Sequence, residues 1–185
     1  MKQFLLILSL SILITTPAFA QKTKDVEIQK TDYSPLVASL ETTLGTLYLS
    51  ISGDKNEKRD WDLFTFLFKD DAKLITTGVD YEGKLQAKYM TPAEYTKSSK
   101  SWMLKNGFYE KEIHRIVHTY GNITQVFSTF EAYHSEADKE PFTKGINSIQ
   151  LMYDGTRWYI INLMWTNETK DKPIPAKYLP QDENN

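Results

Sequence analysis

A change of hydrophobic period at Gly107 constrains the fold of this chain more than any other feature of its sequence. Beyond this glycine, apolar and polar residues alternate with a period of two, and β-branched and aromatic residues are frequent, as in strands that have two different faces. Turn signals divide this half into four segments, at about 109–120, 123–134, 142–153 and 157–167. The sequence therefore predicts a meander of four antiparallel strands.

The half before Gly107 has helical spacing instead. Ser34-Pro35 predicts a helix start, because serine caps free N–H groups and proline fits the first helical position; apolar residues then recur at helical spacing until Gly53. A second, shorter helix around Asp60 is rich in aromatic residues. Thr91-Pro92-Ala93-Glu94 is a capping box, so a third helix begins there and ends at Asn106-Gly107.

Little regular structure is predicted between the second and third helices. Residues 73–77 form a brief extended piece, and the stretch 78–89 is interpreted as a loop or a weak hairpin. Three helices followed by a four-stranded meander is an α+β order, in which the helices cover one face of a curved antiparallel sheet.

The first twenty residues have the pattern of an export signal. Lys2 precedes an apolar run from Phe4 to Ile14, and Ala18-Phe19-Ala20 places small residues where a signal peptidase cleaves. A transmembrane anchor is disfavoured, since this run gives about 16 Å of helix, roughly half of a bilayer's hydrocarbon core. We expect cleavage after Ala20 and a periplasmic or secreted protein. The chain has no cysteine, which excludes lipid attachment, so no stable membrane anchor remains after cleavage.

The rest of the chain divides into a polar lead-in, one folded domain and a proline-containing tail that we expect to be extended. The expected boundaries are 1–20 for the signal peptide, 21–33 for a flexible lead-in, 34–170 for the domain and 171–185 for the C-terminal arm. With 22 Lys and Arg against 24 Asp and Glu residues, the net charge of −2 provides no positive field for nucleic acid.

Several segments together resemble a large group of bacterial proteins. They are Arg59 to Asp62, Thr91-Pro92, Phe108 to Arg115, Phe127 to Glu131, Gly145 to Leu151, and Asp154 to Trp158. From Leu36 to Leu179 the chain resembles the nuclear-transport-factor-2-like (NTF2-like) superfamily, near its SnoaL-like and ketosteroid-isomerase-like branches, and within it an exported branch without an assigned reaction. The resemblance implies helices packed into the concave side of a strongly bent, cone-forming sheet, a pocket at the wide end, and often a dimer. It fixes no activity, because the superfamily contains isomerases, dehydratases, cyclases and binding modules.

Arg115 is the first candidate binding residue. If Gly121-Asn122 is a two-residue turn, Ser128 lies opposite Arg115, and the guanidinium lies among apolar neighbours on the face toward the helices. A buried arginine needs a partner, so it forms a structural ion pair with a carboxylate such as Asp62 or contacts an anionic ligand. Simple exposure to solvent is the third alternative.

Two asparagines are candidates of the same kind. A two-residue hairpin at Asp154-Gly155 places Asn147 opposite Asn162 on an apolar face. The two amides are either a hydrogen-bonded pair or polar groups that line a cavity. The candidates for the cavity wall are Trp102, Tyr48 and Tyr95, although aromatic residues at helical spacing are more often plain core.

The opposite face of the last strands is also expected to be apolar. Tyr159, Ile161, Leu163 and Trp165 alternate along the last segment, and helices can shield only one face of a sheet. The outer face is therefore predicted to form a homodimer interface.

The sequence contains no set of catalytic residues at a spacing characteristic of a known enzyme class. Acid–base chemistry of the ketosteroid-isomerase type needs a carboxyl with a raised pKa and a hydrogen-bond donor, for which Asp62 and Tyr48 are the weak candidates. His114 and His118 lie roughly 13 Å apart on a strand, too far to share a metal ion. We expect no metal and no cofactor, and motifs for nucleophilic hydrolysis or nucleotide binding are missing from the sequence.

Three functions stay open at this level. They are an exported domain that binds a small anionic or apolar molecule, a cofactor-independent isomerase or lyase, and a non-catalytic protein-interaction module. A desolvated carboxyl or histidine in a cavity would favour the enzyme. A cavity lined by Arg115 without such a group would favour binding, and a filled interior would favour the interaction module.

Overall fold

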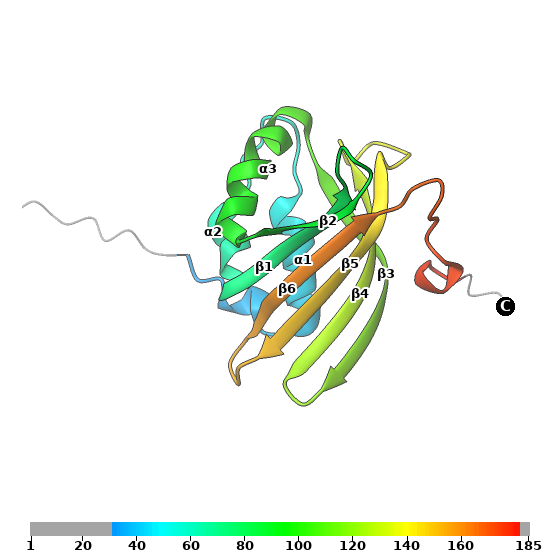
Figure 1. The fold of residues 1–185 in the computed structure, drawn as a ribbon. Coiled ribbons are helices and arrows are strands. Elements are labelled where there is room, and N and C mark those ends of the chain that lie inside the picture. Colours follow the sequence, from blue (N-terminus) through cyan, green and yellow to red (C-terminus); the bar gives the residue numbers. More distant parts are fainter. Residues whose placement is uncertain (1–30, 182–185) are drawn as a thin grey trace, which may run out of the picture. The chain divides into compact units, whose positions relative to one another are not determined.

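The structure is a computed structural model and describes residues 31–181. The predicted signal peptide and most of the predicted lead-in therefore lie outside the described residues. Asp32–Asn185 form one compact unit, whose described part carries all the elements labelled in Figure 1. Its helical elements are η1 (Ser34–Val37), α1 (Leu40–Ile51), α2 (Trp61–Phe66), α3 (Pro92–Asn106) and η2 (Ala176–Tyr178). Its strands are β1 (Phe68–Val79), β2 (Leu85–Met90), β3 (Tyr109–Tyr120), β4 (Ile123–Tyr133), β5 (Thr143–Tyr153) and β6 (Trp158–Asn167).

The strands form one curved sheet in the order β2-β1-β6-β5-β4-β3, and the fold class is α+β as predicted (Figure 1). The described part of the sheet has six strands rather than four, because the stretch predicted as an extended piece and a weak hairpin forms β1 and β2. β1 lies parallel to β6 and antiparallel to β2. The Asp80 carboxylate closes their turn by accepting the N–H groups of Glu82 and Lys84, each at 2.9 Å.

Side-chain caps determine where the helices begin. The capping box at Thr91 and Glu94 is confirmed: the Glu94 N–H donates to the Thr91 hydroxyl, and the Thr91 N–H donates to the Glu94 carboxylate. The first α-helix begins later than predicted, because Ser39 forms a second capping box with Thr42 while Ser34–Val37 is a separate 3-10 turn. Asp60 caps α2 through the Leu63 N–H at 2.9 Å.

The first hairpin has the predicted register, with Arg115 opposite Ser128. The register predicted for the last hairpin is wrong. Its loop spans Asp154–Arg157, because the Asp154 carboxylate accepts the N–H groups of Thr156 and Arg157 and holds a wider turn. A bulge follows in β6, so Asn147 lies opposite Trp165 and Asn162 lies opposite Gln150. Because the bulge adds one residue to β6, the alternation of its side chains reverses. Asn162 therefore lies on the outer face, and Leu163 and Trp165 lie on the inner face.

The hydrophobic core lies between the helices and the inner face of the sheet. Leu44 of α1, Phe64 of α2 and Ile149 of β5 are completely or almost completely buried there. In the described part of the chain, no helix has the length and apolar character needed to cross a bilayer.

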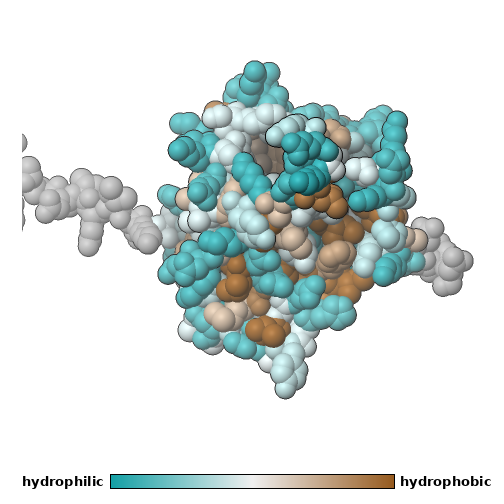
Figure 2. All heavy atoms as spheres, in the orientation of Figure 1, coloured by the Kyte–Doolittle hydropathy of each residue, from teal (hydrophilic) through white to brown (hydrophobic). Residues whose placement is uncertain are grey.

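The outer face of the sheet retains exposed apolar side chains, among them Tyr120, Ile123, Tyr89 and Met164. Apolar residues gather in the middle of the face shown in Figure 2. Part of the outer face is covered by the chain's own C-terminal segment: the Thr129 hydroxyl donates to the Tyr178 carbonyl at 2.5 Å. A homodimer through the remaining outer face stays a prediction.

Candidate functional site

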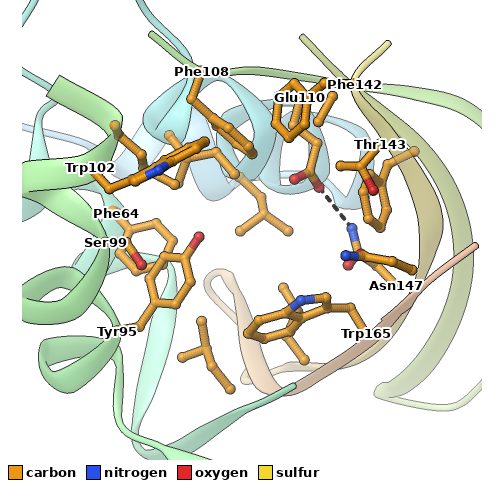
Figure 3. A pocket seen from close by; sticks show the side chains of 18 residues that line it. Phe64, Tyr95, Ser99, Trp102, Phe108, Glu110, Phe142, Thr143, Asn147 and Trp165 are labelled. Atoms are coloured by element: carbon orange, nitrogen blue, oxygen red, sulfur yellow. Dashed lines mark hydrogen bonds between the residues drawn. The ribbon is translucent and has the colours of Figure 1, made fainter. Parts of the chain in front are cut away.

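A cavity of about 280 Å³ lies between the helices and the inner face of the sheet. Its wall is mainly apolar and contains several aromatic rings, and the side chains surround a common central space (Figure 3). The aromatic residues labelled there come from α2, α3, β6 and the segments that precede β3 and β5: Phe64, Tyr95, Trp102, Phe108, Phe142 and Trp165. A cavity of this size with apolar walls is typical of sites for small organic molecules.

The mouth of the cavity is formed by Trp102 and Phe142, which are 45% and 44% exposed. The His134 ring stacks on Phe142 with 4.2 Å between ring centroids and lies 5.9 Å from the Trp102 ring. This stacking joins the end of β4 to the mouth and fixes the position of Phe142.

One carboxyl group points into this aromatic space. Glu110 lies near the start of β3, opposite Ala132 of β4, and both residues line the cavity. Asn147 of β5 donates its amide N–H to Glu110 Oε1 at 3.0 Å, along the dashed line in Figure 3. Burial raises the pKa of Glu110 to about 7, and the hydrogen bond from Asn147 offsets only part of this effect. Among the residues that the structure describes, no lysine or arginine lines the cavity.

Behind the cavity wall, a chain of hydrogen-bonded polar side chains leads from Asn147 to the sheet edge. Asn147 also donates to the Tyr48 hydroxyl at 3.3 Å, and the Tyr48 and Ser128 hydroxyls lie 2.6 Å apart. Ser128 donates to the Glu112 carboxylate, whose other oxygen lies 2.7 Å from Arg115 Nε. Tyr48, Ser128 and Asn147 are all buried, so these hydrogen bonds satisfy groups that water cannot reach.

The direction of each hydrogen bond in this chain follows from the donors available. Because the single Ser128 hydrogen is used on Glu112, Tyr48 is the donor to Ser128. The Tyr48 oxygen then accepts from Asn147, which uses one amide hydrogen on Tyr48 and the other on Glu110. Burial raises the pKa of Tyr48, which keeps its phenol protonated in this role. The network therefore fixes the Asn147 amide with its N–H groups toward Glu110.

Only some of the site residues predicted from the sequence meet in this region. Asn147 and Trp102 line the cavity, whereas Tyr48 and Ser128 lie behind Asn147 in the hydrogen-bonded chain. Asn162 lies on the outer face, since the β6 bulge reverses its orientation.

The charged candidates lie elsewhere. Arg115 is on the inner face at the sheet edge, but it pairs with Glu112 instead of Asp62 and does not line the cavity. Asp62 is exposed in the first turn of α2, where water solvates its carboxylate. His114 and His118 lie opposite Thr129 and Gln125 of β4, respectively, on the outer face.

Glu110 is the site residue that sequence reasoning missed. Counting alternate positions back from Arg115 places Glu110 on the outer face, but a bulge at Ile113 reverses the alternation and turns Glu112 and Glu110 inward. Glu110 and Glu112 follow the apolar Phe108 at a spacing of two. This spacing was the signal in the sequence that could have placed both carboxyls on the same face as Phe108.

Comparison with known proteins connects this geometry to a fold. The sequence matches no family model and no curated protein. Among solved structures, an NTF2-like protein of unknown function from Pseudomonas putida has a TM-score of 0.52 at 11% identity, over 76% of this chain and 93% of that chain. A protein of unknown function with a cystatin-like fold from Nostoc punctiforme has a TM-score of 0.52 at 12% identity, over 70% and 89% of the two chains.

A third similar structure is a protein of unknown function from Mycobacterium tuberculosis, with a TM-score of 0.52 and 12% identity, over 75% of this chain and 80% of that chain. Identities this low establish the fold and leave the activity open. With its curved six-stranded sheet, its three α-helices on the inner face and these structural neighbours, the described part of the chain has the fold of the NTF2-like superfamily.

Proposed function

We propose that this protein binds a small, mainly apolar molecule in the inner cavity, and that Glu110 makes the principal polar contact with it. The observation that carries the proposal is the carboxyl group of Glu110, the one carboxyl among the described lining residues, which has its pKa raised to about 7 and faces a mainly apolar cavity of about 280 Å³. An anionic ligand is disfavoured, because Glu110 would repel it and Arg115 is engaged with Glu112 outside the cavity. The signal-peptide pattern supports binding outside the cytoplasm.

The cavity can be tested with N-phenyl-1-naphthylamine, a neutral probe that becomes fluorescent in apolar surroundings. Thr143, which lines the cavity, is the position to block: Thr143→Trp is expected to weaken probe binding at least about tenfold, because the indole occupies ligand space. Thr166→Trp is the matched control, since Thr166 is exposed on the outer face of the neighbouring strand. Equal affinities of the two variants would place the probe outside the cavity and contradict the proposal.

A second candidate function is proton transfer by a cofactor-independent isomerase or lyase, and the protonation state of Glu110 favours it. A carboxyl with a pKa of about 7 is present in both acid and base forms at neutral pH. Tyr95 lines the same cavity, and burial raises the pKa of its phenol, which leaves it protonated and able to donate to a carbonyl oxygen.

Hydrogen exchange at the carbon next to a carbonyl group tests this chemistry. With a small cyclic ketone in D2O, the protein is expected to accelerate deuterium incorporation, and Glu110→Gln is expected to lower the rate by about 10² to 10⁴. Tyr95→Phe should lower the rate while leaving probe binding intact. Incorporation at the same rate with the parent protein and Glu110→Gln would exclude Glu110 as a base and leave binding as the function.

A further inference from the structure

The cavity contains a group that can become an anion, but the structure supplies no cation to neutralise it. Glu110 accepts one hydrogen bond, from the uncharged amide of Asn147. The nearest cation along the hydrogen-bonded chain is Arg115, and its guanidinium is bound to Glu112. In the described part of the chain, the lining contains no lysine, arginine or histidine. An ionised Glu110 therefore has its negative charge only partly compensated by the protein.

The walls that face Glu110 are unusually suitable for positive charge. The faces of aromatic rings carry negative electrostatic potential and attract ammonium groups, most strongly when the site excludes water. Trp102 and Phe108 lie across the cavity from Trp165, and Glu110 lies at one end of the same space (Figure 3). A cation placed there meets a carboxylate and several aromatic side chains together.

We propose that the ligand of this cavity is a small organic cation, an amine or quaternary ammonium compound, whose positive group pairs with Glu110 and whose apolar part contacts Trp102, Phe108 and Trp165. This inference depends on the proposed binding function and narrows it to one chemical class. Its basis is the combination of a carboxylate without a counter-cation and an aromatic wall in one cavity.

The protonation of Glu110 makes a cation distinguishable from a neutral ligand. A permanent cation binds the ionised carboxylate, so its affinity rises with pH up to the pKa of Glu110, which is about 7 without ligand. A neutral apolar ligand has no such requirement and binds at least as well when Glu110 is protonated.

Other titratable groups near Glu110 come from several elements. Tyr95 of α3 and Tyr48 of α1 have pKa values raised by burial, so both stay neutral through this range. Glu112 of β3 is paired with Arg115, and His134 lies at the mouth against Phe142. A variant of Glu110 is therefore needed to separate the effect of Glu110 from that of His134.

Phenyltrimethylammonium and tert-butylbenzene form a matched pair of probes, since they have nearly the same shape and differ in charge. The binding of each probe to the full chain is measured by tryptophan fluorescence at pH 5.5, 7.0 and 8.5. We expect the cation to bind at least about tenfold more tightly at pH 8.5 than at pH 5.5, while the neutral isostere changes little. Glu110→Gln should abolish both the preference for the cation and its pH dependence. Glu82→Gln, at an exposed turn outside the cavity lining, should change neither.

Each other outcome contradicts a defined part of the account. If tert-butylbenzene binds, and phenyltrimethylammonium binds no more tightly at pH 8.5 than at pH 5.5, the inference of a cationic ligand is wrong and the proposed function stands. If the pH dependence persists in Glu110→Gln, another group such as His134 is responsible and the inference is wrong. If neither compound nor N-phenyl-1-naphthylamine binds, the proposed function fails together with the inference.

Discussion

Replacing Glu110 with glutamine is expected to make the protein more stable at pH 8, by about 2 to 3 kcal/mol, and to change its stability much less at pH 5. The pKa of this carboxyl rises from 4.5 to about 7 on folding, and each pKa unit corresponds to about 1.4 kcal/mol. Because Glu110 is partly accessible to solvent, the expected effect is smaller than the pKa change multiplied by the energy per pKa unit.

The sign follows from proton binding. Between pH 4.5 and about 7 the folded state binds more protons at Glu110 than the unfolded state, so the stability contributed by this group falls as the pH rises. The loss is complete above the folded-state pKa. Glutamine has no charge to desolvate, and it can still accept the hydrogen bond from Asn147.

Urea unfolding of the parent, Glu110→Gln and the exposed control Glu82→Gln at pH 5, 6, 7 and 8 measures this effect. The difference between the parent and Glu110→Gln should grow with pH, whereas the difference for the control should stay constant. A pH-independent difference for Glu110→Gln would show that its carboxyl is not desolvated by folding.

Arg59→Ala is expected to lower the free energy of unfolding by about 3 to 5 kcal/mol, because it removes a buried side chain that donates hydrogen bonds to several backbone carbonyls. Arg59 is only 8% exposed. Its guanidinium and Nε donate to backbone carbonyls of Ile51 at 3.3 Å, Asp54 at 3.1 Å, Glu57 at 2.6 Å and Phe108 at 3.4 Å, and of Gly53. Alanine removes these five hydrogen bonds, leaves the Gly53, Asp54 and Phe108 carbonyls with only their backbone partners, and creates a cavity.

The same substitution is expected to weaken ligand binding. Arg59 joins the end of α1 to the segment before β3, and both Ile51 and Phe108 line the cavity. Arg59→Lys should recover only part of the stability, since an ammonium group cannot reach carbonyls in several directions at once.

Arg115→Ala serves as the comparison for Arg59→Ala in urea unfolding. Its side chain is 34% exposed and forms one ion pair, so its loss should cost no more than about 1 kcal/mol. Similar losses for the two alanine variants would contradict the role given to Arg59.

Local chemistry made some parts of the fold predictable from the sequence. The start of α3 depends on Thr91 and Glu94, which lie three positions apart and form a complete capping box. The register of β3 and β4 depends on the short Gly121-Asn122 turn, and it placed Ser128 opposite Arg115 as expected. In both cases the residues that determine the structure lie within a few positions of one another.

The errors come from features that depend on the assembled sheet. β2 lies at the sheet edge with nearly all of its residues exposed, so its sequence lacks the alternation that marks a half-buried strand. The bulges in β3 and β6 each reverse which residues face inward, and no glycine or proline marks their positions in the sequence. The first reversal brought Glu110 into the cavity, and the second removed Asn162 from it.

A carbon-13 NMR titration of the Glu110 carboxyl measures whether folding removes this group from water. In protein labelled at glutamate Cδ, the Glu110 resonance is identified by its absence from Glu110→Gln. We expect a titration midpoint near pH 7, which moves lower when phenyltrimethylammonium is added. A midpoint near 4.5 that the cation leaves unchanged would contradict a desolvated carboxyl in a ligand cavity.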